Sequence, residues 1–181
     1  MKLFGIFAGI MGFFGLVFLV SLFFPKEYRI ERSTVINKPV YETFAYMNSV
    51  RNWADWSPWN TDLDSSMVSF YSKVKSGEGS SQYFRGGLVG VGRFRITKSL
   101  LNEMIHYDLS INEGTMHSEA TFYFRALGNK THLMWVDSGD VGYNPIYRFM
   151  LPSKISSTES GFEEGLLQIK KAAEKINQPT F

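Results

Sequence analysis

The chain has 181 residues, of which 44% are hydrophobic and 20% are charged, and its formal net charge is +2 at pH 7. This composition predicts one folded domain plus one unusually apolar segment, and it argues against a disordered chain or a multidomain enzyme. The absence of cysteine excludes disulfides, thiolate metal sites and a cysteine nucleophile. Lysines and arginines are scattered singly among acidic residues, so the sequence predicts no nucleic-acid partner.

The chain opens with an uncharged run of 22 residues, residues 3–24. A helix of that length is about 33 Å long, enough for a hydrocarbon core of about 30 Å. The run therefore predicts a single-pass membrane protein, with a transmembrane helix over residues 1–25 and a folded domain over residues 26–181. A cleavable signal peptide is the alternative, but the end of the run lacks a small-x-small cleavage site.

The charges around this run bear on its orientation. Lys2 precedes it, whereas four basic residues between positions 26 and 38 follow it. The positive-inside rule then favours a cytoplasmic domain, although the opposite orientation stays open. Gly5, Gly9 and Gly12 suggest weak self-association of the helix, although glycine is common in membrane helices in any case.

The rest of the chain predicts one strand, short helices and then a meander of strands. Residues 28–36 alternate apolar and polar side chains, which indicates a strand. Residues 39–55 change to a helical period that begins at Pro39. Turn residues, among them Asn112, Glu113 and Gly114, divide the next part into antiparallel strands. These six strands are predicted at about 67–74, 80–85, 91–99, 104–111, 118–127 and 131–137.

The alternation also predicts which face of the sheet is buried. Tyr107 and Phe122 lie in the apolar register of their strands, whereas Arg93 and Arg125 lie in the polar one. A final amphipathic helix supplies the cover for the apolar face. A shorter helix is expected over residues 144–151, before Pro152. The prediction is an α+β fold in which an antiparallel seven-stranded curved sheet wraps around a long C-terminal helix.

Four segments in this order resemble a known family. They are the opening strand at residues 32–39, the tryptophan-rich stretch at 53–59, a glycine-rich hairpin before Gly90, and the closing helix from Phe162. Over residues 28–175 the sequence resembles the polyketide cyclase and lipid-transport family of the START-like (SRPBCC) superfamily. The resemblance implies the helix-grip fold and a deep cavity for lipids, sterols, polyketides or other apolar molecules. It implies no shared catalytic residues, because members include binders, carriers, cyclases and regulators.

Aromatic side chains are the candidate lining of such a cavity, because ligand sites are mostly apolar with a few polar groups. Packing of the same side chains in an ordinary core is the alternative. Asp137 is the best candidate for an inward acid, but a turn residue at a strand end is the stronger interpretation of it. The predicted ligand-cavity residues are Trp56, Trp59, Tyr83, Phe94, Tyr107, Phe122, Trp135 and Phe162.

Motifs for other chemistry are weak. His106, His117 and His132 fall on separate strands without the ligand spacing of a metal site, so no metal, cofactor or catalytic residue is predicted. The leading hypothesis is a membrane-anchored, non-catalytic domain that binds an apolar small molecule or lipid between sheet and C-terminal helix. The alternatives are a polyketide-cyclase-like enzyme acting on a hydrophobic substrate, and an interaction module with a filled core.

Overall fold

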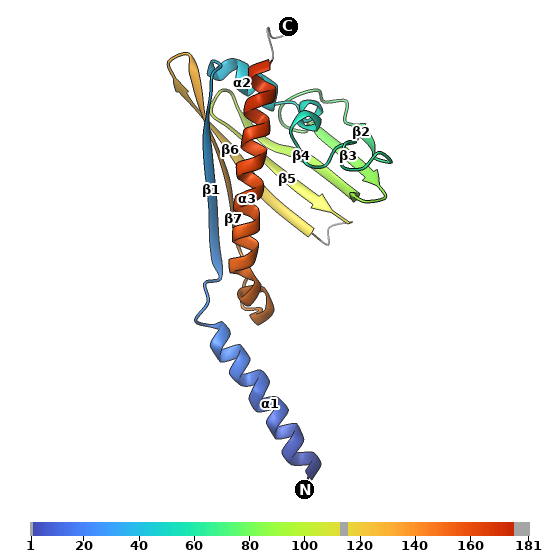
Figure 1. The fold of residues 1–181 in the computed structure, drawn as a ribbon, viewed down its shortest axis with the longest axis vertical. Coiled ribbons are helices and arrows are strands. Elements are labelled where there is room, and N and C mark those ends of the chain that lie inside the picture. Colours follow the sequence, from blue (N-terminus) through green and yellow to red (C-terminus); the bar gives the residue numbers. More distant parts are fainter. Residues whose placement is uncertain (1, 113–115, 176–181) are drawn as a thin grey trace. The chain divides into compact units, whose positions relative to one another are not determined.

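A computed structural model describes residues 2–112 and 116–175. In chain order, a helix, a strand and two short helices come first, and six further strands and the long last helix follow (Figure 1). Glu113 and Gly114 of the predicted turn lie outside the described residues. The elements are α1 (Lys2–Ser21), β1 (Glu27–Ile36), α2 (Val40–Met47), the 3-10 helix η1 (Val50–Asp55), β2 (Val68–Tyr71), β3 (Ser81–Gly86), β4 (Gly90–Leu100), β5 (Met104–Ile111), β6 (Met116–Leu127), β7 (Lys130–Asp140) and α3 (Pro145–Lys175).

The strands form one seven-stranded sheet in the order β1-β7-β6-β5-β4-β3-β2. Strands β2 to β7 are consecutive antiparallel neighbours, and β1 lies beside β7. The register of β4 against β5 shifts between Ile96 and Lys98, which is the kind of bulge that bends a strand. The predicted α+β class, the seven-stranded sheet and the long C-terminal helix are confirmed.

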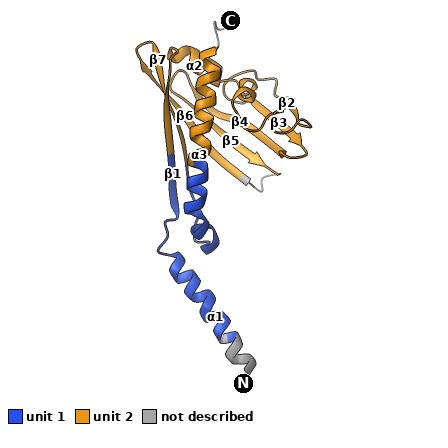
Figure 2. Cartoon of the chain, in the orientation of Figure 1, with its two compact units in different colours: residues 1–30, 138–158 blue, residues 31–137, 159–181 orange. Residues whose placement is uncertain are grey.

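The chain divides into two compact units, shown in blue and orange in Figure 2. Unit 1 comprises residues 1–30 and 138–158, and unit 2 comprises residues 31–137 and 159–181. Strands β1 and β7 and helix α3 each contribute to both units. The boundary predicted between residues 25 and 26 stays a prediction.

Polar contacts tie together the two chain segments of unit 1. Lys26 forms an ion pair with Asp140 at 3.1 Å. The buried Arg148 donates from Nε to the carbonyl of Gly142 at 2.8 Å and from Nη1 to the carbonyl of Ser21 at 3.2 Å. The guanidinium thereby holds the end of α1 against the start of α3.

The expectation of a membrane anchor is wrong. Helix α1 ends at Ser21, and the next three residues form turns in which each N–H bonds to the carbonyl three positions back. A crossing helix needs about 20 consecutive apolar residues. Across the residues that the structure describes, no helix is long and apolar enough to cross a membrane. This finding overturns the predicted transmembrane helix and the single-pass location. Contact with a membrane through residues 3–24 stays a prediction.

Helix α1 also contains the glycines for which self-association is predicted. Nothing lies within 4 Å of a Cβ built at Gly9 or Gly12. Self-association through Gly5, Gly9 and Gly12 stays a prediction.

Helix α3 also differs from the prediction. The sequence predicts a short helix that stops before Pro152, but α3 continues through this proline to Lys175. The Oδ1 atom of Asn144 accepts the N–H of Ile146 and so caps the start of the helix. A proline inside a helix costs about 3 kcal/mol, because it removes one hydrogen bond and crowds the preceding turn. Burial of Leu151, Leu166 and other apolar residues of α3 offsets that cost.

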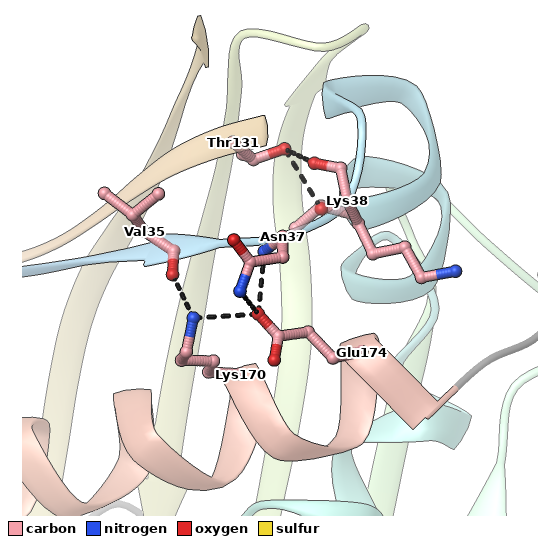
Figure 3. Close-up of polar contacts among 7 residues, drawn as sticks. Val35, Asn37, Lys38, Thr131, Lys170 and Glu174 are labelled. Atoms are coloured by element: carbon pink, nitrogen blue, oxygen red, sulfur yellow. Dashed lines mark hydrogen bonds and ion pairs between the residues drawn. The ribbon is translucent and has the colours of Figure 1, made fainter. Parts of the chain in front are cut away.

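In unit 2, the last turns of α3 are fixed to the end of β1 by a polar network (Figure 3). The side chain of Glu174 accepts the backbone N–H of Asn37 at 2.7 Å and its side-chain amide at 2.9 Å. Lys170 donates to the carbonyl of Val35 and pairs with Glu174 at 2.8 Å. These contacts set the position along β1 at which the helix lies.

Candidate functional site

The inner face of the sheet in unit 2 carries a cluster of aromatic side chains from four neighbouring strands. Phe122 and Trp135 are direct partners across β6 and β7, and their ring centroids lie 4.8 Å apart. Tyr107 of β5 stacks on Phe122 at 5.4 Å, and Phe94 of β4 lies 6.3 Å from Tyr107. Strand alternation places these rings on one face, as the sequence predicts.

Helix α3 closes over this face through one aromatic contact and one glycine. The ring of Phe162 stacks on Trp135 with a centroid distance of 4.0 Å and an interplanar angle of 9°. One turn later, a Cβ atom built on Gly165 would lie 2.6 Å from Cζ3 of Trp135. Only glycine therefore lets the helix approach the indole this closely without displacement of one or the other.

Trp53 and Trp56, from the 53–59 stretch, belong to the same aromatic cluster. Trp53 is fully buried, contacts Tyr107 at 4.9 Å, and donates from Nε1 to the carbonyl of Met47 at 2.8 Å. Trp56 lies edge-on to Phe122 and Trp135, at 5.9 and 5.6 Å. The aromatic cluster therefore combines rings from the sheet, from α3, from η1 and from Trp56, the residue that follows η1.

One polar atom in this cluster is unsatisfied. The Trp56 side chain is only 5% exposed, and its Nε1 has no hydrogen-bond partner among the described residues. A buried donor without an acceptor costs about 1 to 3 kcal/mol relative to a paired one. The aromatic cluster therefore contains one hydrogen-bond donor, Nε1 of Trp56, that can still bind an acceptor.

The Tyr107 hydroxyl and the Asp137 carboxyl group are two further polar groups on this face of the sheet. Nε1 of Trp135 donates to the Tyr107 hydroxyl at 3.1 Å. Burial raises the pKa of Tyr107 far above its usual range, and the negative charge of Asp137 raises it further, against the opposing effect of the Trp135 hydrogen bond. Tyr107 is therefore protonated at any physiological pH. Asp137 itself is 4% exposed.

Strand register places Tyr107 and Asp137 on the same face of the sheet. Tyr107 lies opposite Ala120, and Ala120 lies opposite Asp137, so the three form one row across β5, β6 and β7. The interpretation of Asp137 as a turn residue is wrong, because β7 continues to Asp140. The sequence pattern in which Asp137 follows Leu133 and Trp135 at every second position was the correct signal.

Most of the predicted cavity residues lie in this cluster. Trp59, which is half-buried, lies at its edge with its ring 5.8 Å from Phe94. Tyr83 does not belong to it, because it is 42% exposed and contacts Phe70 on the other face. Its neighbour Phe84 is the buried ring of β3. The residues that lie together are Trp56, Trp59, Phe94, Tyr107, Phe122, Trp135 and Phe162.

Sequence reasoning chose the wrong ring of β3 because Tyr83 and Phe84 are adjacent and both aromatic. The structure also adds Trp53 to the cluster. A signal for Phe84 existed in Arg85, which alternates with it and belongs on the solvent face together with Tyr83. The polar Gln82, buried beside Phe84 and bonded to Ser69 at 3.0 Å, concealed that signal.

Known proteins resemble this chain in structure rather than in sequence. No protein-family profile matches the chain, and no curated protein matches it. Aha1 from Colwellia psychrerythraea, solved as a dimer, is 18% identical with a TM-score of 0.57, over 83% of this chain and 99% of that one. Protein MLL2253 from Mesorhizobium loti is 12% identical with a TM-score of 0.60, over 83% of this chain and all of that one.

A third solved structure is CalU16 from Micromonospora echinospora. It is 12% identical with a TM-score of 0.53, over 82% of this chain and 85% of the other. At these identities the similarity concerns the fold alone. It agrees with the sheet order and the long α3, and the chain therefore has the helix-grip fold that the START-like resemblance implied.

Proposed function

We propose that unit 2 binds a small, mainly apolar molecule that carries a hydrogen-bond acceptor, beside the aromatic cluster under α3. The unpaired Nε1 of Trp56 is the observation that carries this proposal. An acceptor oxygen of a ligand would satisfy the donor, and the surrounding rings would cover the apolar remainder. The lipids, sterols and polyketides implied by the START-like resemblance share this chemistry.

The row of Tyr107, Ala120 and Asp137 supports a location for the ligand's polar end. The outer two strands of three neighbours lie about 9 to 10 Å apart. The buried Ala120 contributes only a methyl group between them, and the Tyr107 hydroxyl reaches toward β7, where it accepts the Nε1–H of Trp135 at 3.1 Å. A polar group over Ala120 would meet hydrogen-bonding side chains on both sides.

Two probes of matched shape test the proposal on the full chain. 2-Acetylnaphthalene has a carbonyl acceptor, whereas 2-ethylnaphthalene has none. By equilibrium dialysis we expect the acetyl compound to bind about two- to tenfold more tightly, which is the range for one net hydrogen bond. Trp56→Phe should abolish this difference and leave the binding of the ethyl compound unchanged.

The control is Trp59→Phe, which changes a half-buried tryptophan at the cluster edge and should preserve the preference for the acetyl compound. Mass spectrometry of an organic extract of the purified chain provides an independent search for a bound ligand. If neither probe saturates and no ligand is extracted, the alternative of an interaction module with a filled core is correct. The ring contacts of the cluster, down to 4.0 Å, are the observation in favour of that alternative.

A second candidate function is acid–base chemistry on the bound molecule. The buried pair of Tyr107 and Asp137 favours it, since a protonated phenol and a carboxylate are a hydrogen-bond donor and a general base. Incubation of an extracted ligand with the chain should then change the mass or the isomer composition of that ligand. Asp137→Asn should prevent the change while the ligand still binds, whereas a pure binder would leave the ligand unaltered in both proteins.

A further inference from the structure

The outer face of the sheet brings four metal-binding side chains together on two neighbouring strands. His106 and Asp108 are two residues apart on β5, and His117 and Glu119 are two residues apart on β6. Side chains at every second position share one face of a strand. The register places Asp108 opposite Glu119 and His106 opposite Thr121. The two pairs therefore lie side by side on β5 and β6, on the face of the sheet opposite the aromatic cluster.

The distances suit a single ion. One ligand atom from each of His106, Asp108 and Glu119 lies within 4.8 Å of the others. Nε2 of His106 is 3.7 Å from Oε2 of Glu119, and Nε2 of His117 is 3.2 Å from Oε1 of Glu119. Donor atoms around tetrahedral zinc lie about 3.3 Å apart, given bonds of about 2.0 to 2.2 Å. Closing the site requires side-chain movements of about 1 to 1.5 Å.

Thr121 orients the central histidine. Its Oγ1 lies 2.8 Å from Nδ1 of His106, and the threonine is buried. When the hydroxyl accepts Nδ1–H, the lone pair of Nε2 is directed toward Glu119. Histidines that bind metals usually have such a partner on the second ring nitrogen.

The charges around the site are mixed. On β4, Arg95 lies opposite Asp108 and Lys98 lies opposite His106. Both cations are exposed, so solvent and salt screen their repulsion of an incoming ion. Asp108 on β5 and Glu119 on β6 would supply two negative charges in direct contact with the ion.

We propose that His106, Asp108 and Glu119, with His117 beside them, bind one divalent transition-metal ion. Zn²⁺ fits best, because it accepts imidazole and carboxylate ligands together in a four-coordinate site. The sequence prediction of no metal considered only pairs of histidines. The signal that it passed over is a His-x-Asp run followed by a His-x-Glu run on the next strand.

Calorimetric titration of the full chain with ZnCl₂ tests the site. We expect one ion per chain. Thr121→Val should weaken binding about tenfold, and His106→Gln and Glu119→Gln should weaken it more. His132→Gln is the matched control, because His132 lies on β7 opposite Arg125 and outside the cluster. It should bind like the wild type.

A second measurement separates loss of the site from loss of the fold. Ligands that bind only the folded state raise the melting temperature. Zn²⁺ should therefore raise the melting temperature of the wild type and of His132→Gln, but not that of Glu119→Gln, whose exposed side chain can be changed without disturbing the core. Failure of the wild type to saturate with Zn²⁺, or equal binding by folded Glu119→Gln, would overturn the proposal.

Discussion

The ring of Phe162 in α3 stacks on the ring of Trp135 in β7, with centroids 4.0 Å apart and planes within 9° of parallel. This contact joins the long helix to the inner face of β7, which lies next to the edge strand β1. Gly165 lies one turn further along the same helix, where an added Cβ atom would lie 2.6 Å from the same indole. The spacing between helix and sheet in unit 2 therefore depends on one aromatic pair and one missing side chain.

Phe162→Ala should lower the free energy of unfolding by about 3 to 5 kcal/mol, because it removes a buried ring and leaves a cavity against Trp135. Urea denaturation followed by circular dichroism measures the change. Leu167→Ala changes an exposed side chain of the same helix and should cost about 0.5 kcal/mol or less. Equal effects of the two substitutions would show that the stacked pair does not anchor α3.

Gly165→Ala should destabilise the chain by about 1 to 3 kcal/mol, since its Cβ would be forced against the Trp135 ring. Gly161→Ala is a control in the same helix, where nothing lies within 4 Å of the new atom. That change should stabilise the chain by up to about 1 kcal/mol through helix propensity. Thermal unfolding of both variants measures these opposite effects. An unchanged or higher melting temperature for Gly165→Ala would contradict the close approach of α3 to Trp135.

Asp64 predicts a pH dependence of stability. It is 4% exposed, and hydrogen bonds from Ser66 and from the N–H groups of Val89 and Leu88 lower its pKa from 3.8 to about 2. Because the folded pKa is below the unfolded one, the carboxylate contributes fully above about pH 4. That contribution is lost as the pH falls toward 2.

Asp64→Asn tests this directly. The variant should melt below the wild type at neutral pH, and the gap should narrow between about pH 4 and 2. Melting curves recorded at several pH values provide the measurement. A gap that stays constant down to pH 2 would show that ionised Asp64 is not what holds the loops around Ser66 and Leu88.

Ala120→Leu should weaken binding of 2-acetylnaphthalene, because the larger side chain fills the row between Tyr107 and Asp137. Overpacking costs about 1 to 3 kcal/mol of stability, so only folded protein is compared. Ala126→Leu, at an exposed position of the same strand, is the control. If both variants bind the probe as the wild type does, the ligand does not lie over Ala120.

The sequence determined the secondary structure of the strands and the layer arrangement. Alternation with a period of two is a local property, and it predicted the six meander strands and the inward position of Tyr107, Phe122 and Trp135. The amphipathic period predicted that the last helix covers them. These inferences needed no knowledge of distant contacts, because burial of one face repeats along each element.

Local patterns failed where two interpretations fitted equally well. Adjacent aromatic residues at Tyr83 and Phe84 permit either register, and only pairing with β2 and β4 decided which ring is buried. Pro152 predicts a helix end, but α3 continues through it, because buried apolar residues on both sides of the proline stabilise the helix. The uncharged run at the start predicts a membrane crossing, but none of the described helices is both long and apolar enough for one.

Tertiary structure alone decided the composition of both candidate sites. Phe162 reaches Trp135 and Glu119 reaches His106 only after strands and helix take their positions, because these pairs are distant in sequence or on different strands. Strand register, which depends on every pair in the ladder at once, aligned Tyr107 with Asp137 across Ala120. The unpaired Nε1 of Trp56 likewise follows from which atoms are close in space, and sequence periodicity contains no information about that.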